Sequence, residues 1–151
     1  MKIWDTAGQE RFHTIVRSFL RGSNLVLIVY DTTDYKSFKK IKVWLEEIKE
    51  LAPKNVKKVI VGNKIDLEGN RMVEYNLAKN FAKENACEYF ETSAKKNLNI
   101  EEMFECLTAD LLKTKKLEIV EEIKKLEDSI ELHQQENKPI KNNKCGQCYI
   151  L

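Results

Sequence analysis

LVLIVYD, at residues 25–31, is a continuous apolar run that ends in an acid. Apolar and polar residues do not alternate in it, which is typical of a strand buried on both faces, as in a parallel sheet. A second such run, KVIVG, occupies residues 58–62, and a shorter third, CEYFE, occupies residues 87–91. An earlier strand is expected to end at Trp4. Together these runs predict a mostly parallel sheet.

Helical periodicities fill the intervals between the expected strands. Apolar residues recur at three- and four-residue steps over residues 38–51, 77–82 and 100–111. Asn99, with Glu102 three residues later, predicts a capping box at the start of the last helix. Alternating strands and helices indicate an α/β fold with helices on both faces of the sheet, and ligands at the carboxyl ends of the strands.

The composition of the chain excludes several classes of protein. Its 151 residues, 42% of them hydrophobic, favour one domain with a real core. With 26 basic and 24 acidic residues, the net charge of +2 is too small for a dedicated nucleic-acid-binding protein. The sequence has no run of eighteen apolar residues, and its first residues do not resemble a signal peptide. We therefore expect a protein of the cytosol or of its membrane surfaces.

Two of the four cysteines, Cys87 and Cys106, fall in an expected strand and an expected helix. In a reducing cytosol both are predicted to be small core residues. After Leu112 the sequence is rich in Lys and Glu, with apolar residues at heptad-like spacing over residues 119–130. We interpret this segment as a solvated extension of the last helix, with a short coiled-coil or partner-docking helix as the alternative. Residues 137–144 lose the pattern and are expected to be flexible.

Three expected strands are each followed by a loop with a recognisable group of residues. WDTAGQERF occupies residues 4–12, NKID residues 63–66 and ETSAK residues 91–95. Taken singly, the NKxD pattern has a modest false-positive rate and SAK a high one, but all three motifs in this order, each at a strand end, form a strong signal. The alternative interpretation is a set of surface turns with chance lettering. Over about residues 1–113 the motifs resemble those of the Ras superfamily of GTPases.

Four further segments narrow the resemblance; they are MKIW (1–4), RFHTIV (11–16), FLRGS (19–23) and IVYDTT (28–33). On these segments the chain is identified as a member of the Rab family within that superfamily. The resemblance implies a P-loop NTPase-like small-GTPase fold, incomplete at the N-terminus, over residues 1–113, and a hypervariable helical extension with a prenylated tail over residues 114–151. His13, where Arg is common, and Phe19 and Leu20, where two tyrosines are usual, leave the subfamily open.

The NKID and ETSAK loops are expected to hold the base of GTP or GDP. A carboxylate can accept two hydrogen bonds and guanine presents two adjacent donors, so Asp66 would select guanine over adenine. Asn63 would tie the two loops together, and Lys64 would lay its aliphatic stem over the ring. The backbone N–H of Ala94 would face guanine O6. The remaining members of the nucleotide-binding set that the resemblance implies are Ser93 and Lys95.

The loop after the first expected strand resembles the part of a Rab protein that faces the phosphates. Asp5 resembles the acid that helps hold Mg²⁺ there, directly or through water. Gly8 resembles the hinge of switch II, and Gln9 resembles the catalytic residue that orients the attacking water. Alternatively, this segment is only a turn at a strand end. Trp4 and Phe19 would belong to an aromatic surface that effectors contact, unless they are core residues.

The phosphate-binding loop of the family, GxxxxGK[ST], does not occur in these 151 residues. That loop cradles the phosphates and helps bind Mg²⁺, and phosphoryl transfer depends almost wholly on such positioning. We therefore expect this chain to be inactive alone, and interpret it as a truncated product or an incomplete gene model. Without the first strand of the family, the strand ending at Trp4 and the strand at residues 25–31 are expected to lose backbone partners.

The last residues, CGQCYIL at 145–151, contain a lipidation signal. Cys148 begins a C-a-a-X pattern whose final Leu151 favours geranylgeranyl transfer. Cys145 is a candidate second lipid site, because one lipid chain seldom anchors a protein stably. The alternative is a redox or zinc-binding C-x-x-C, which here lacks a second cysteine pair.

For the complete protein, the resemblance implies a Rab-type switch that binds GTP or GDP with Mg²⁺ and regulates vesicle-mediated transport. By resemblance, its partners are effectors, exchange factors, GTPase-activating proteins and prenyl-binding escort proteins, with no nucleic acid among them. It is expected at the cytoplasmic face of endomembranes through its lipid, and partly in the cytosol. The alternative is a prenylated, nucleotide-free interaction module that competes for Rab partners.

Overall fold

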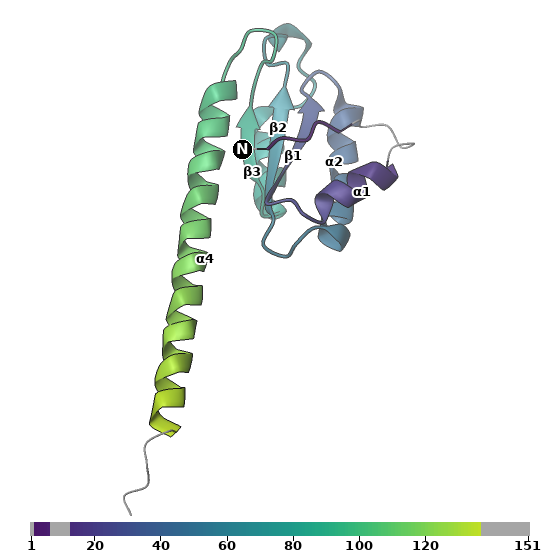
Figure 1. Ribbon diagram of the computed structural model, residues 1–151. Coiled ribbons are helices and arrows are strands. Elements are labelled where there is room, and N and C mark those ends of the chain that lie inside the picture. The colour runs from purple at the N-terminus through teal and green to yellow at the C-terminus, as the bar shows by residue number, and fades with distance from the viewer. Residues whose placement is uncertain (1, 7–12, 137–151) are drawn as a thin grey trace, which may run out of the picture. The chain divides into compact units, whose positions relative to one another are not determined.

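The computed structural model of the chain describes residues 2–6 and 13–136 (Figure 1). The chain divides into two compact units, Met1–Leu111 and Leu112–Leu151, and the sheet lies in the first of them. The elements, in order, are α1 (His13–Leu20), β1 (Leu25–Asp31), α2 (Tyr35–Leu51), β2 (Lys57–Asn63), the short 3-10 helix η2 (Glu68–Asn70), α3 (Tyr75–Glu84), β3 (Glu88–Glu91) and α4 (Ile100–Glu136).

The three strands form one parallel sheet in the order β1-β2-β3. Asp31 is level with Asn63, and Gly62 is level with Glu91, so all three strands end at the same edge. The expected α/β class and parallel pairing are therefore confirmed, with strand bounds within one residue of those expected. This shared edge brings together the loops that follow the strands.

Helices cover both faces of this sheet because successive strand residues point to opposite sides. Ile28 and Ile60 lie in a buried cluster with residues of α2 and α3. Val59 and Val61 lie in a second cluster with Met103 and Leu107 of α4. The apolar stripe expected in α2 is confirmed; its buried residues are Phe38, Ile41, Leu45 and Ile48.

The segment before α1 does not form the strand that the sequence predicts. Residues 2–6 have no regular secondary structure, and Ile3 and Trp4 are 61% and 54% exposed. A strand needs the backbone of a neighbour, and β1 is at the edge of the described sheet, with Val29 58% exposed. The prediction of a strand ending at Trp4 is therefore wrong for this chain. Nor was α1 expected from the sequence; it buries Leu20 against the core.

Two finer expectations about α4 are also wrong. The Asn99 side chain donates to the carbonyl of Glu91 at 2.8 Å, and Asn99 has a φ of 57°, so it does not form a capping box with the helix. Cys106 is exposed, because it precedes the buried Leu107 by one residue and so points about 100° away around the helix. Cys87, by contrast, is half-buried against the core.

The second unit begins at Leu112 and contains the remainder of α4, which ends at Glu136. The expected helical extension is thus present. Its apolar side chains at Leu112, Ile119 and Ile123 are 63%, 56% and 50% exposed. Their exposure is consistent with both a solvated helix and a docking helix. Among the described residues, no helix is long and apolar enough to cross a membrane.

Candidate functional site

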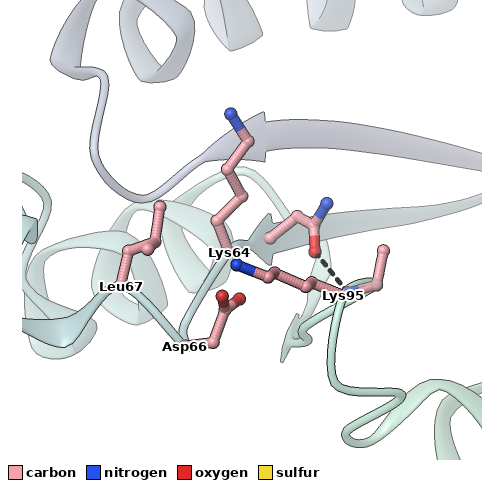
Figure 2. Close-up of a pocket in the computed structure, with 6 residues that line it drawn as sticks. Lys64, Asp66, Leu67 and Lys95 are labelled. Atoms are coloured by element: carbon pink, nitrogen blue, oxygen red, sulfur yellow. Dashed lines mark hydrogen bonds between the residues drawn. The ribbon is translucent and has the colours of Figure 1, made fainter.

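A cavity of about 260 Å³ lies where β2 and β3 end (Figure 2). The loop after β2 and the loop after β3 supply its walls, although they are far apart in the sequence. Five of its six lining residues, all except Leu67, belong to the expected nucleotide-binding set. The lining residues are Asn63, Lys64, Asp66, Leu67, Ala94 and Lys95.

Side-chain hydrogen bonds join the two loops directly. The Ser93 hydroxyl donates to Asp66 Oδ1 at 2.6 Å, and the Ala94 N–H donates to Asn63 Oδ1 at 3.0 Å, the dashed line in Figure 2. Ser93 is fully buried. Asn63 therefore ties the loops together in the way expected. The Ala94 N–H, expected to face a base, is directed to Asn63 in this structure.

The Asp66 carboxylate is held in its ionised form. The hydrogen bond from Ser93 is the main cause that lowers the pKa of Asp66, and the positive charge of Lys95 adds to it. Figure 2 shows the Lys95 side chain extending toward this carboxylate. An ionised carboxylate only accepts hydrogen bonds, so the group is suited to a ligand edge that presents donors.

Lys64 is directed to the other side of the cavity from Asp66. Its backbone has a φ of 70°, and its ammonium group forms an ion pair with Asp31 at the end of β1, pointing away from Asp66 in Figure 2. Thr33 donates to the same carboxylate through its N–H and its hydroxyl, at 2.8 and 2.7 Å. Burial opposes ionisation of Asp31, but the hydrogen bonds from Lys64 and Thr33 outweigh it and lower its pKa.

Replacing Asp31 by Asn is expected to flatten the loss of stability at acid pH. Because the folded pKa of Asp31 is depressed, its stabilisation is complete above its ordinary pKa of roughly 3.9 and is lost as pH falls through the folded value. At neutral pH the variant should lose only about 0.5–1 kcal/mol, since the Lys64 side chain is 52% exposed and solvent screens the pair. Urea unfolding between pH 7 and pH 2.5 measures both effects.

Asp34 provides the matched control for that experiment. It caps α2 by accepting from the Lys36 N–H at 2.8 Å, and Asn caps a helix about as well as Asp. Asp34→Asn should therefore keep the stability of the unmodified chain at neutral pH. Acid-unfolding curves of Asp31→Asn that run parallel to those of the unmodified chain would contradict the assignment.

Sequence reasoning missed an ion pair beside the cavity. Arg71 donates to both carboxylate oxygens of Glu91, at 2.8 and 2.9 Å. The Tyr89 hydroxyl also donates to Glu91, at 2.7 Å, and its oxygen lies 2.9 Å from the Tyr30 hydroxyl oxygen. Burial is the main cause that raises the pKa of Tyr89. The position of Glu91 at the start of ETSAK was visible in the sequence, but nothing there indicated Arg71 as its partner.

Of the residues expected at the phosphates, the structure describes one, Asp5, which is exposed in an irregular segment and does not line the cavity. Gly8 and Gln9 lie outside the described residues, as do the expected lipid sites Cys145 and Cys148. Among the residues that the structure describes, no group of three His, Cys, Asp or Glu side chains could hold a metal ion. The assembled part of the site is therefore the part expected to bind a base.

Trp4 and Phe19, the two residues of the aromatic surface that the Rab resemblance implies, lie together. Their rings are stacked, with centroids 4.5 Å apart and an interplanar angle of 26°. The Lys2 ammonium lies 4.5 Å from the Trp4 ring centroid. Trp4 is half exposed and Phe19 is half-buried. Contact of this aromatic pair with effectors remains a prediction.

Comparison with known proteins gives a consistent set of relatives. The Ras family model matches residues 1–113. GTP-binding protein YPTM1 of Zea mays is 48% identical over 115 residues, which are 76% of this chain and 55% of that protein. GTP-binding protein YPT1 of Saccharomyces cerevisiae is 52% identical over 69% of this chain and 50% of its own length. Ras-related protein Rab-10 of Diplobatis ommata is 48% identical over 74% and 56%. The chain spans about half the length of these relatives.

Proposed function

We propose, because this chain belongs to the Ras family and within it to the Rab-type small GTPases, that its cavity holds the base of GTP or GDP. The observation that carries the proposal is the pair of hydrogen bonds that join the two loops. Ser93 holds the Asp66 carboxylate ionised, and Asn63 holds the Ala94 N–H nearby. A hydrogen-bond acceptor and a donor thus lie beside the same cavity, and the Ala94 N–H would exchange its bond to Asn63 for one to the ligand.

Guanine matches these groups in the following way. Its N1–H and 2-amino group would donate to Asp66, and its O6 would accept from Ala94. The aliphatic stem of Lys64, which lines the cavity, would cover one face of the ring. Adenine has neither the N1–H nor the 2-amino group; it would present the lone pair of N1, which the carboxylate repels, and a C2–H that does not replace the lost donor. Lys95, on the far wall, adds positive charge to the site.

A second part of the proposal concerns the residues that would face the phosphates and Mg²⁺, of which the structure describes only Asp5. We propose that Asp5 holds Mg²⁺ directly or through water, that Gly8 faces the γ-phosphate and that Gln9 orients the water in hydrolysis. A single carboxylate suits Mg²⁺, which keeps several waters and binds phosphate oxygens. Mg²⁺ would neutralise phosphate charge. These 151 residues contain no phosphate-binding loop of the family's pattern. We therefore propose hydrolysis of GTP only for a protein in which such a loop completes the site.

Titration of the 151-residue chain with GDP, guanosine and ADP, with and without Mg²⁺, tests the proposal. GDP and guanosine should bind with similar affinity, because the base contacts would supply most of the binding, and ADP should not bind. Circular dichroism and urea unfolding of the same sample establish that it is folded. A cooperatively folded chain that binds neither GDP nor guanosine would contradict the proposal, and would favour an interaction module without nucleotide.

The wider role follows from the Rab family. We propose residues 1–113 as the GTPase part and residues 114–151 as a variable extension with a lipid-bearing tail. The protein would act in vesicle-mediated transport on the cytoplasmic face of endomembranes and partly in the cytosol. Its partners would be effectors that contact Trp4 and Phe19, exchange factors, GTPase-activating proteins and prenyl-binding escort proteins.

Replacing Cys148 by Ser is expected to release the protein from membranes in cells. A geranylgeranyl chain on this sulfur would supply most of the membrane affinity, since each buried CH₂ contributes about 0.8 kcal/mol. The membrane-bound fraction should fall by at least roughly tenfold, while Cys145→Ser should have a smaller effect. Fractionation and the mass of the C-terminal peptide measure this. An unmodified Cys148 in the membrane fraction would count against prenylation.

A further inference from the structure

The Arg71–Glu91 ion pair joins the two loops of the cavity from outside it. Arg71 follows the loop that holds Asp66, and the next two residues, Met72 and Val73, donate their N–H groups to the carbonyl of Thr32 at 2.9 and 3.1 Å. This end of the loop is therefore fixed to the end of β1. The Arg71 guanidinium then reaches across to the last residue of β3.

Glu91 is placed so that its ion pair with Arg71 also holds the start of the loop after β3. It directly precedes Thr92 and Ser93, and the Thr92 N–H donates to the carbonyl of Gly62 at 2.8 Å. Its side chain is 12% exposed, and that of Arg71 is 18% exposed. Tyr89 donates to the same carboxylate and is itself bonded to Tyr30. Neither member of the ion pair lines the cavity.

The burial of this pair argues for a role beyond stability. Removing two charges from water costs much of what their attraction returns, so buried ion pairs are weak sources of stability compared with apolar side chains of similar size. A two-bond pairing of guanidinium and carboxylate, however, fixes distance and angle. The Arg71–Glu91 ion pair therefore constrains the separation of the two chain segments to which Arg71 and Glu91 belong.

We propose that the Arg71–Glu91 ion pair is a positioning device for base recognition, which sets the separation of the Asp66 carboxylate and the Ala94 N–H without touching the ligand. This inference rests on the proposed binding of guanine. When O6 of the base accepts from Ala94, that N–H gives up its bond to Asn63, and one of the inner ties between the loops is lost. The outer ion pair is unaffected by this exchange and keeps the loops aligned.

Arg71→Met removes the ion pair and keeps an apolar stem of similar length, and Arg71→Lys keeps the charge without the two-bond geometry. Lys57→Met is the matched control. Lys57 is also partly buried and forms ion pairs with Glu88 and Asp110, at 2.7 and 2.8 Å, but it begins β2, at the opposite end of the strand from the cavity. The Lys57→Met substitution should lower the stability of the fold without changing the two loops that line the cavity.

The first readout is amide hydrogen exchange in the full chain without nucleotide. In Arg71→Met the N–H groups of Ser93 and Ala94 should exchange on the order of tenfold faster, relative to the most protected amides of the sheet, than in Lys57→Met. Arg71→Lys should fall between. Equal relative exchange in the two Met variants would overturn the inference. Should Arg71→Met fail to fold, Arg71→Lys decides by the same comparison with Lys57→Met.

The second readout is the ratio of affinities for GDP and IDP. Hypoxanthine lacks the 2-amino group of guanine, so this ratio reports how well Asp66 is placed for its second hydrogen bond. We expect the ratio to fall several-fold in both Arg71 variants and to be unchanged in Lys57→Met. An unchanged ratio in folded Arg71 variants would overturn the inference. Failure of the unmodified chain to bind GDP would instead contradict the proposed function, while hydrogen exchange would still decide whether Arg71 aligns the loops.

Discussion

Replacing Asp66 by Asn is expected to weaken GDP binding by roughly a hundredfold and to raise the affinity for XDP. Guanine presents two donors to this side chain, and an Asn amide offers only one acceptor beside its own N–H₂ donor. Two donors then face each other. Xanthine carries a carbonyl in place of the 2-amino group, so its acceptor and its N–H match the amide. Titration of the variant and of the unmodified chain with GDP and XDP measures the change in the ratio of the two affinities.

Two features of the site make this substitution a clean test. The hydrogen bond from Ser93 can still be accepted by the Asn carbonyl oxygen, so the loop connection is preserved. Asp110→Asn is the control, because Asp110 pairs with Lys57 away from the cavity. This substitution removes the same charge as Asp66→Asn. It should leave both affinities as they are. A folded Asp66→Asn chain that binds GDP as tightly as the Asp110→Asn chain would contradict the assignment of Asp66.

The strands and the cavity could be predicted because their determinants are local. Unbroken apolar runs indicated β1 and β2, and motifs directly after β2 and β3 had to meet once the strands ran parallel. Most of the α2 stripe followed from periodicity alone. No knowledge of distant partners was needed for any of these features.

The features that sequence reasoning missed depend on partners. The segment at residues 2–6 has the composition of a strand, but pairing requires a neighbour, and the structure shows none for it within the described residues. Cys106 was assigned to the core by residue type, whereas its place around α4 decides its exposure. Arg71 and Glu91 meet only because the turn containing η2 brings them together, which no spacing rule indicates.

Replacing Gly62 by Ala is expected to destabilise the fold by about 2 kcal/mol. A Cβ on this buried residue of β2 would lie 2.8 Å from the Tyr30 hydroxyl oxygen and 3.1 Å from Thr32 Cγ2. The Tyr30 ring has little freedom to move away. It contacts the Phe38 ring edge-on at a centroid distance of 5.2 Å, and its hydroxyl is bonded to that of Tyr89. The free energy of unfolding in urea measures the cost.

Substitutions at Gly69 and Tyr30 are the controls that show whether the close approach to Tyr30 causes the loss of stability in Gly62→Ala. A Cβ at Gly69 would meet nothing within 4 Å, so Gly69→Ala should change stability by less than about 0.5 kcal/mol. Tyr30→Phe removes the closest atom, so adding it to Gly62→Ala should cost less than the sum of the two changes. Equal stability of Gly62→Ala and Gly69→Ala would refute the close approach. Because Tyr30 is bonded to Tyr89, and Tyr89 to Glu91, a displaced Tyr30 should also speed amide exchange at Ser93.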